Sequence, residues 1–246
     1  MEIYKIDDVV SIPFDHKWNK IAISLSGGAD SALLTHLLLD IIEDTFSKTE
    51  VHIISHVRMW KTRPWQSYDS LNVYNYFVKK YPKIQFYRHS GFVAPDLEWG
   101  DKGPYMYDEY NKWVSGDNIQ IRAYSEYICF QNNIEAYYNA VTRNPRNVAF
   151  EGMNTRDIEL NEENKHLELM THMGKIVSHP FRFIEKDWIV SQYQKRNLID
   201  LFNITRSCEG EFPNLNFKNY KEGMEIPLCN ECFWCKERKW AIEKSK

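Results

Sequence analysis

The first half of the chain alternates short apolar runs with amphipathic stretches. Apolar runs at residues 21–25, 51–56 and 84–87 have the length of buried strands. Between them, apolar positions recur at helical spacing over about residues 32–46 and 68–80. Strands and helices that alternate in this way predict a parallel sheet with helices on both faces. The predicted fold class is therefore α/β, with a doubly wound, mainly parallel sheet.

The second half of the chain is less regular. Residues 91–118 lack a period, which indicates either a long ordered loop or lid, or a surface insertion without chemistry. The other predicted elements are a long helix over about 119–141, strands over 147–150 and 175–178, a helix from about Glu185 and a last helix over 236–244. We divide the chain into an α/β domain of residues 1–200 and a smaller C-terminal region of residues 201–246.

The junction between the first predicted strand and the first predicted helix has the sequence SGGADS, residues 26–31. Two glycines allow positive φ angles and close approach of the backbone to a ligand. Successive N–H groups at the start of a helix then form a concave anion site, to which Ser26 and Ser31 add hydroxyl donors. The pattern therefore predicts a phosphate or pyrophosphate site. The alternative is an ordinary strand–helix turn in which Asp30 and Ser31 cap the helix.

Composition and charge narrow the class of protein. The chain has 246 residues, 43% hydrophobic and 26% charged, with a net charge of −3. This balance is typical of a globular protein, and it provides no overall basic field for nucleic acid or an anionic membrane. No apolar run approaches the ~20 residues of a membrane span, and the N-terminus has no signal-peptide pattern. We expect a cytoplasmic protein without a nucleic-acid or membrane partner.

Four of the five cysteines lie near the C-terminus: Cys208, Cys229, Cys232 and Cys235. In a cytoplasmic protein such a cluster favours metal binding over disulfides. Four thiolates suit a tetrahedral, structural Zn²⁺ that would attach the C-terminal region to the main domain. A [4Fe–4S] cluster and a redox-active CxxC pair are the competing interpretations. The fifth cysteine, Cys129, is predicted to be a buried, inert thiol.

The loop SGGADS resembles the SGGxDS signature of the PP-loop ATP pyrophosphatases. Together with the cysteine cluster it resembles the 7-cyano-7-deazaguanine synthase family, over about residues 21–241. Further similar segments are residues 148–157 (G-x-N-x-x-D), 178–189 (P-[LF]…K-x-x-I), 205–208 (T-W-S-C) and 229–238 (C-x-x-C-x-x-C-x-x-R). The chain departs from the family where Arg206 replaces Trp and where residues 158–162 replace the Y-P-D-C-R-x-E-F segment.

The resemblance implies an ATP-dependent carbon–nitrogen ligase. The family adenylates 7-carboxy-7-deazaguanine, releases pyrophosphate, uses ammonia to form the amide and then dehydrates the amide to the nitrile, as in queuosine biosynthesis. ATP, Mg²⁺ and Zn²⁺ are the implied cofactors. The chain carries no glutaminase domain, so ammonia would be free or delivered by a partner. A homodimer is compatible with the sequence.

The resemblance also implies residue roles. The nucleotide residues would be Ser24, Leu25, Ser26, Gly27, Gly28, Ala29, Asp30, Ser31, Ala32 and His56. Asp30 would hold Mg²⁺ or cap the helix, and Lys186 would reach the phosphates or be an exposed lysine. The substrate pocket would include Arg122, Asn154, Arg156 and Asp157, of which the last two are alternatively a surface pair.

Two other functions compete with the ligase. One is a PP-loop enzyme of the thiolase or lysidine type that adenylates tRNA, against which the net charge of −3 argues. The other is a non-catalytic nucleotide-binding module, which the altered substrate segment keeps open.

Overall fold

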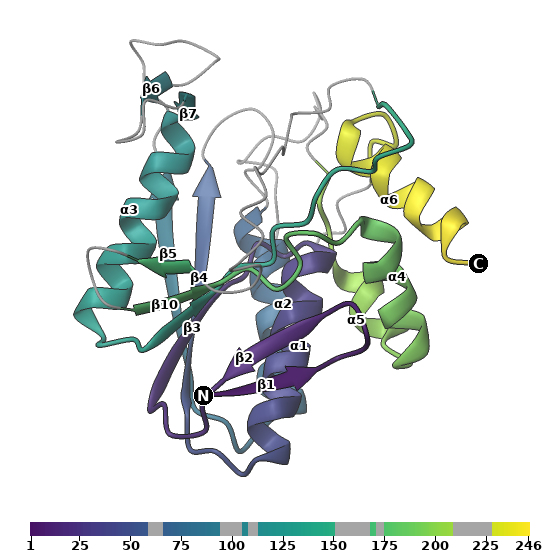
Figure 1. The fold of residues 1–246 in the computed structure, drawn as a ribbon. Coiled ribbons are helices and arrows are strands. Elements are labelled where there is room, and N and C mark those ends of the chain that lie inside the picture. Colours follow the sequence, from purple (N-terminus) through teal and green to yellow (C-terminus); the bar gives the residue numbers. More distant parts are fainter. Residues whose placement is uncertain (59–65, 94–104, 108–112, 151–167, 171–174, 209–227) are drawn as a thin grey trace.

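The computed structural model describes residues 1–58, 66–93, 105–107, 113–150, 168–170, 175–208 and 228–246 (Figure 1). Its centre is a six-stranded sheet in the order β5-β4-β3-β8-β10-β9. Five of these strands are parallel, and β9 pairs antiparallel with β10 at one edge. The strands are β3 (Lys20–Ser24), β4 (Glu50–Arg58), β5 (Phe86–Val93), β8 (Ala136–Tyr138), β9 (Glu168–Met170) and β10 (Lys175–Ser178).

Two small hairpins stand apart from this sheet. They are formed by β1 (Glu2–Lys5) with β2 (Ser11–Phe14) and by β6 (Tyr105–Tyr107) with β7 (Trp113–Ser115). The described helices are α1 (Ala29–Asp44), α2 (Gln66–Lys80), α3 (Gly116–Gln131), α4 (Lys186–Lys195), α5 (Ile199–Ile204) and α6 (Phe233–Lys244). None of these helices combines the length and apolar character that a membrane crossing requires.

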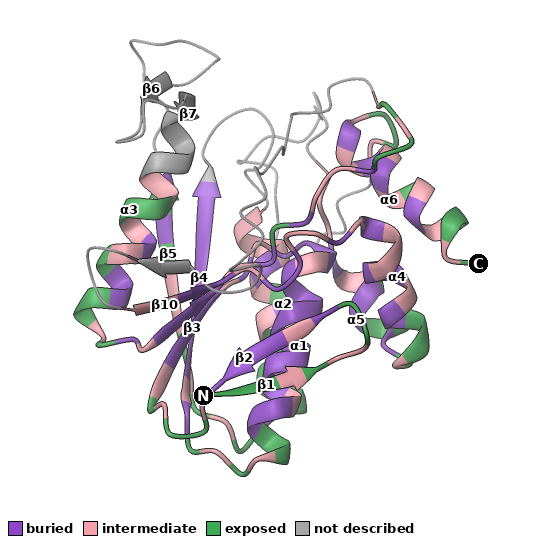
Figure 2. Cartoon of the chain, viewed as in Figure 1, coloured by how far each residue is buried: buried purple, intermediate pink, exposed green. Residues whose placement is uncertain are grey.

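Helices cover both faces of the sheet, as the alternation along β3 illustrates. Ile21 and Ile23 point into the main core, which contains the apolar residues of α1 and α4. The residue between them, Ala22, belongs to a second cluster on the opposite face, with Ile128 and Cys129 of α3. Successive strand residues face opposite sides, so a strand buried on both faces is apolar throughout. Figure 2 shows α1 and the central strands as the most continuously buried elements.

The strand order reverses at β3. From β3 the chain passes through α1 to β4 and through α2 to β5, which extends the sheet in one direction. It then returns through α3 to β8, which pairs with the free side of β3. Ligands in open α/β sheets bind outside the carboxyl ends of the strands at such a reversal. The SGGADS loop follows β3 and therefore lies at this position.

Most predicted elements are confirmed. The strands near residues 21–25, 51–56 and 84–87 correspond to β3, β4 and β5, and the strand over 175–178 corresponds to β10. The helices predicted over 32–46, 68–80 and from Glu185 correspond to α1, α2 and α4. Of the segment 91–118, residues 94–104 and 108–112 lie outside the described part of the chain.

Two predictions were wrong. The helix expected over residues 119–141 ends at Gln131, and β8 begins five residues later at Ala136. Asn133 has a left-handed φ of 53°, and the Ile134 N–H donates to the Cys129 carbonyl at 2.9 Å. This is a Schellman motif, which ends a helix without a glycine signal. The strand expected at 147–150 is irregular chain, because β8 already occupies the place next to β3.

Candidate functional site

Gly27 is the residue around which the SGGADS loop turns. Its φ of +83° is a conformation that side chains with a Cβ rarely adopt. A Cβ on Gly27 would also lie 2.7 Å from the Asp69 carbonyl carbon and from the Ser70 nitrogen. The first turn of α2 therefore packs directly against the loop. Only glycine satisfies both the backbone angle and this close approach.

The two serines of the loop hold its shape. The Ser31 hydroxyl donates to the Gly28 carbonyl at 3.1 Å and accepts from the Ser26 N–H at 3.2 Å. The Gly28 N–H donates to the Ser26 hydroxyl at 3.3 Å. The N-cap of α1 is Gly28, and it has no side-chain cap hydrogen bond. The expectation that Asp30 and Ser31 cap the helix is therefore wrong.

The first turn of α1 carries N–H groups that form no hydrogen bond within the helix. The first hydrogen bond of the helix runs from the Ala32 N–H to the Gly28 carbonyl at 3.1 Å, so the preceding N–H groups have no carbonyl partner within the helix. Two hydrogen bonds attach the residue before the loop, Leu25, to β4. The Leu25 N–H donates to the Ile54 carbonyl at 2.8 Å, and the Ser55 hydroxyl donates to the Leu25 carbonyl at 3.0 Å. This geometry is that of an anion site.

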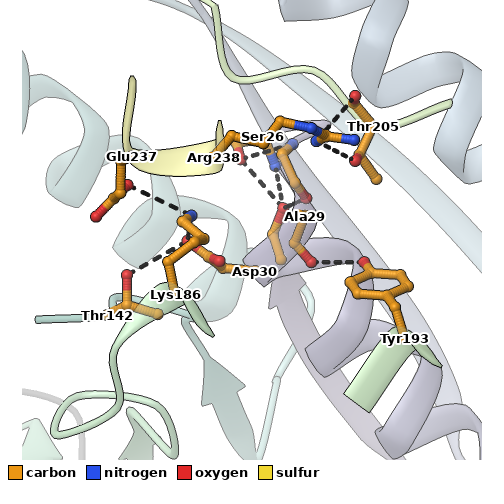
Figure 3. A network of polar contacts seen from close by, with 11 residues as sticks. Ser26, Ala29, Asp30, Thr142, Lys186, Tyr193, Thr205, Glu237 and Arg238 are labelled. Atoms are coloured by element: carbon orange, nitrogen blue, oxygen red, sulfur yellow. Dashed lines mark hydrogen bonds and ion pairs between the residues drawn. The ribbon is translucent and has the colours of Figure 1, made fainter. Parts of the chain in front are cut away.

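Asp30 and Lys186 lie 156 positions apart in the chain and form a buried ion pair (Figure 3). The Lys186 ammonium also lies 3.8 Å from a carboxylate oxygen of Glu237, whose side chain is fully buried. Thr142 donates to the same Asp30 oxygen, Oδ2, at 3.4 Å. Lys186 is only 4% exposed, so the prediction of an exposed lysine is wrong. Glu237 and Thr142 carried no sequence signal.

The second oxygen of Asp30, Oδ1, is buried and has no hydrogen-bond partner among the described residues. A buried carboxylate oxygen without a partner is costly unless a cation or a donor occupies the space beside it. Oxygen ligands of this kind suit Mg²⁺. Asp30 therefore fits the role of a magnesium ligand at the phosphate loop, with Lys186 holding the other oxygen in place.

A second cationic side chain, Arg238, lies close enough to the loop to interact electrostatically with Asp30. Arg238 donates to the Thr205 hydroxyl at 2.9 Å (Figure 3). It also donates to the Phe202 carbonyl at 2.8 Å, and its guanidinium stacks on the Phe202 ring. Burial, together with the nearby charge of Arg206, lowers the pKa of Arg238 to about 10. Arg238 was visible in the sequence as the arginine of the C-x-x-R pattern, without a role.

Asp69 is a site residue that sequence reasoning missed. It lies in the first turn of α2, against Gly27. Burial raises the pKa of its carboxyl to about 7, and the positive charge of Arg206 opposes this rise. No motif includes Asp69, and only the packing of α2 against the loop brings it there.

The remaining predicted residues lie on α3, beside α3 or outside the described chain. His56 is buried on the face covered by α3, where its Nε2 lies 3.3 Å from the Ser125 hydroxyl and its ring meets the edge of Tyr124. Arg122 is exposed on α3 and forms an ion pair with Glu126 at 2.7 Å, and its place in a substrate pocket stays a prediction. Asn154, Arg156 and Asp157 lie outside the described residues.

The four C-terminal cysteines come together in the fold. The sulfur atoms of Cys208, Cys229, Cys232 and Cys235 all lie within 4.8 Å of one another, and those of Cys229 and Cys235 are 3.8 Å apart. Thiolates bound tetrahedrally to one Zn²⁺ at ~2.3 Å are roughly 3.8 Å apart. In a [4Fe–4S] cluster each thiolate binds a different iron, which sets the sulfur atoms farther apart. The spacing therefore fits a single tetrahedral ion and is compatible with zinc.

Backbone donors favour the thiolate form of one cysteine of the cluster, Cys229, whereas burial raises the pKa of Cys235. Burial alone would raise the pKa of Cys229, but N–H donors from Cys232 and Glu231 lower it to about 7. The Cys229 N–H in turn donates to the Cys208 sulfur at 3.3 Å. Metal ligands must be deprotonated, so donors of this kind favour metal binding.

The cysteine cluster is connected to the phosphate loop at two places. Cys208 is the last residue of the segment 205–208, in which the Arg206 N–H donates to the Gly27 carbonyl at 2.8 Å. Cys235 lies in α6, which also carries Glu237 and Arg238. The SGGADS loop near the N-terminus and the cysteine cluster near the C-terminus are therefore joined in the fold.

Comparison with known proteins gives little further information. The sequence matches no family model, and no curated protein resembles it closely enough to be counted a relative. Among solved structures, the chain is similar to a U34-tRNA thiolase, NcsA, from Methanococcus maripaludis, whose structure holds a [4Fe–4S] cluster. The identity is 12%, the TM-score is 0.46, and the match covers 92% of this chain. The chain spans 65% of that protein's length. A similarity at this level says nothing about activity.

Proposed function

We propose that this protein is an ATP-using enzyme of the PP-loop type, which adenylates its substrate and releases pyrophosphate. The observation that supports this most directly is the convergence near one loop of the N-terminus of α1, the Asp30–Lys186 pair and the partly buried Arg238. Pyrophosphate carries several negative charges, and a leaving group of this kind is stabilised by preorganised N–H donors and cations. The SGGADS sequence is the pattern expected for that task.

The adenylated group that we propose is a carboxylate, 7-carboxy-7-deazaguanine. A carboxylate oxygen attacks the α-phosphorus of ATP, the bond to the bridging oxygen breaks, and pyrophosphate leaves. Ammonia then attacks the acyl-adenylate, AMP leaves, and the amide forms after loss of a proton. The amide oxygen then attacks the α-phosphorus of a second ATP and pyrophosphate leaves; loss of AMP and of the two protons on nitrogen gives the nitrile. This acceptor rests on the resemblance of the loop and the cysteine segment alone.

Within this proposal the charge of each residue sets its role. Asp30 would hold Mg²⁺ through Oδ1, and bound Mg²⁺ would neutralise phosphate charge. Lys186 is fixed between Asp30 and Glu237, so its position is set before a nucleotide arrives. A positioned cation contributes more to a charged transition state than a mobile one. Zn²⁺ would have a structural role, because four cysteine ligands leave no open coordination position.

The test is the identity of the products. The protein should release AMP and pyrophosphate from ATP when 7-carboxy-7-deazaguanine, ammonium and Mg²⁺ are present. Lys186→Met should reduce this release at least about 100-fold, the size of the effect of one lost charge-stabilising group. Lys17→Met is the matched control, because Lys17 is exposed and distant from the loop. ADP and phosphate as products would contradict the proposal, and AMP release with tRNA but not with the acid would overturn the acceptor.

A further inference from the structure

The segment 205–208 lies directly on the SGGADS loop, although nothing in the sequence links the two. A Cβ built on Gly28 would come within 2.7 Å of the Ser207 hydroxyl oxygen and within 3.4 Å of the Ser26 hydroxyl oxygen. Gly28 has an extended φ of −80°, so its backbone alone does not require glycine. The absence of a side chain at Gly28 thus leaves a space on which two hydroxyls converge.

This space is at the N-terminus of α1, where the anion site lies. Gly28 is the N-cap, so the space opens next to the N–H groups that have no partner within the helix. A serine hydroxyl is a short, neutral donor that suits a phosphate oxygen without adding charge. The Ser207 hydroxyl lies near the same point beside Gly28 as the Ser26 hydroxyl, so both are placed at the start of α1, where a phosphoryl group would bind.

Ser207 is held in this position from both sides. On one side, the Arg206 N–H bonds to the Gly27 carbonyl, and Arg238 donates to the Thr205 hydroxyl. On the other side, Cys208 is one of the four clustered cysteines. Arg238 and Cys235 both belong to α6, so the cysteine cluster constrains the segment at both ends.

We propose that Ser207 is a further ligand of the pyrophosphate, and that the cysteine cluster positions it. This inference rests on the proposed function, because it assigns Ser207 to the same phosphate site. The cluster then has a second consequence besides stability. It completes one wall of the nucleotide site with a residue from the C-terminal region.

The experiment measures the affinity of the zinc-loaded protein for Mg²⁺-pyrophosphate and for adenosine by calorimetry. Ser207→Ala should weaken pyrophosphate binding by about tenfold, the expected effect of losing one hydrogen bond to a charged group. Adenosine lacks phosphates, so its affinity should not change. Ser207→Thr keeps the hydroxyl and should restore pyrophosphate binding. Ser191→Ala on α4, whose hydroxyl donates to the Trp188 carbonyl, is the control and should bind as the wild type does.

Zinc content is measured on every variant. This measurement distinguishes a Ser207 that binds pyrophosphate from a Ser207 that only supports the metal site. Loss of pyrophosphate affinity with zinc retained supports the proposal. Unchanged affinity in Ser207→Ala overturns it while the proposed function stands. Loss of zinc together with affinity also overturns it, since Ser207 would then serve only the metal site. If the wild-type protein fails to bind pyrophosphate at all, the proposed function itself is wrong.

Discussion

At the scale of single residues, the two glycines of the loop have different tasks. Gly27 is needed for its left-handed backbone and for the approach of α2. Gly28 has an extended backbone, and the nearest atoms to a Cβ at this position would be the Ser207 and Ser26 hydroxyl oxygens, with the Arg206 carbonyl oxygen farther away at 3.7 Å. A substitution at each position should therefore damage a different property.

Gly27→Ala should lower the free energy of unfolding by at least about 1–2 kcal/mol, the cost of a left-handed backbone, with a further contribution from the clash with Asp69. Gly28→Ala should change stability less, because a serine hydroxyl can move aside, but it should weaken pyrophosphate binding. Urea unfolding and calorimetry measure the two effects. The opposite ranking of the two variants in stability would contradict this assignment.

Asp69 makes the free energy of unfolding depend on pH. Burial raises the pKa of its carboxyl to about 7 in the folded state, from 3.8 in the unfolded chain. Between these two values the folded state binds the proton and the unfolded state does not, so stability falls as the pH rises. Below the unfolded-state pKa and above the folded-state pKa, this contribution no longer changes.

Asp69→Asn should remove that dependence. As the pH rises from about 4 to about 7, the free energy of unfolding of the wild type should fall relative to that of the variant, by up to about 1.4 kcal/mol per pH unit. Other groups titrate equally in both proteins, so the difference between the two urea unfolding curves isolates Asp69. Parallel stability curves across this range would show that the Asp69 carboxyl is ionised as in water.

At the scale of elements, the end of α3 decides the order of the sheet. The apolar spacing continues past Gln131, and only Asn133, with φ of 53°, breaks the helix. The Schellman motif then buries Ile134 against Cys129. The next residues enter the sheet as β8, beside β3. Periodicity carries no information about such a stop when neither glycine nor proline marks it.

Asn133→Ala should destabilise the protein by about 1 kcal/mol, because alanine tolerates the left-handed conformation less well than asparagine. Asn133→Gly should be neutral or slightly stabilising, since glycine is the usual residue at this place of the motif. Asn132, one residue earlier, is partly buried and donates to the Ile128 carbonyl at 2.9 Å, so it is not an equivalent site. Equal stability of the alanine and glycine variants in urea unfolding would exclude a role for the backbone angle.

At the scale of the whole molecule, the C-terminal helix is part of the main core. Ala241 of α6 belongs to the same apolar cluster as Ala29 of α1 and Tyr193 of α4. The division into residues 1–200 and 201–246 remains a prediction, but this shared core links the two regions. We therefore expect the cysteine cluster to stabilise the entire molecule rather than a separate module.

Purified protein should be colourless and carry one zinc ion per chain. Removing the metal should lower Tm by roughly 10 °C in a single transition, from a few kcal/mol of lost metal binding at about 2–4 °C per kcal/mol. Cys232→Ser should do the same. Cys129→Ala is the control, because Cys129 is a buried residue of α3 outside the cluster, and the variant should keep the metal. A brown protein, or a melting curve that chelation leaves unchanged, would contradict this prediction.

The sequence by itself indicated the parallel sheet, the SGGADS loop and the four cysteines that the fold brings together. These features depend on local patterns: apolar runs of strand length, two adjacent glycines between a strand and a helix, and cysteines at ligand spacing. Each pattern reflects backbone or side-chain chemistry that acts over a few residues, so it can be read without knowing the fold.

Only the tertiary structure decided which distant residues surround the loop. Glu237 and Asp69 have ordinary positions in the sequence, and their importance arises because α6 and α2 pack near the loop. Lys186 was expected from the sequence to reach the phosphates, but its pairing with Asp30 and Glu237 is a product of the fold. Contacts of this kind depend on packing between elements far apart in the chain, which no local pattern encodes. The same reason explains Ser207, which the fold places beside Gly28 although the two residues lie 179 positions apart in the sequence.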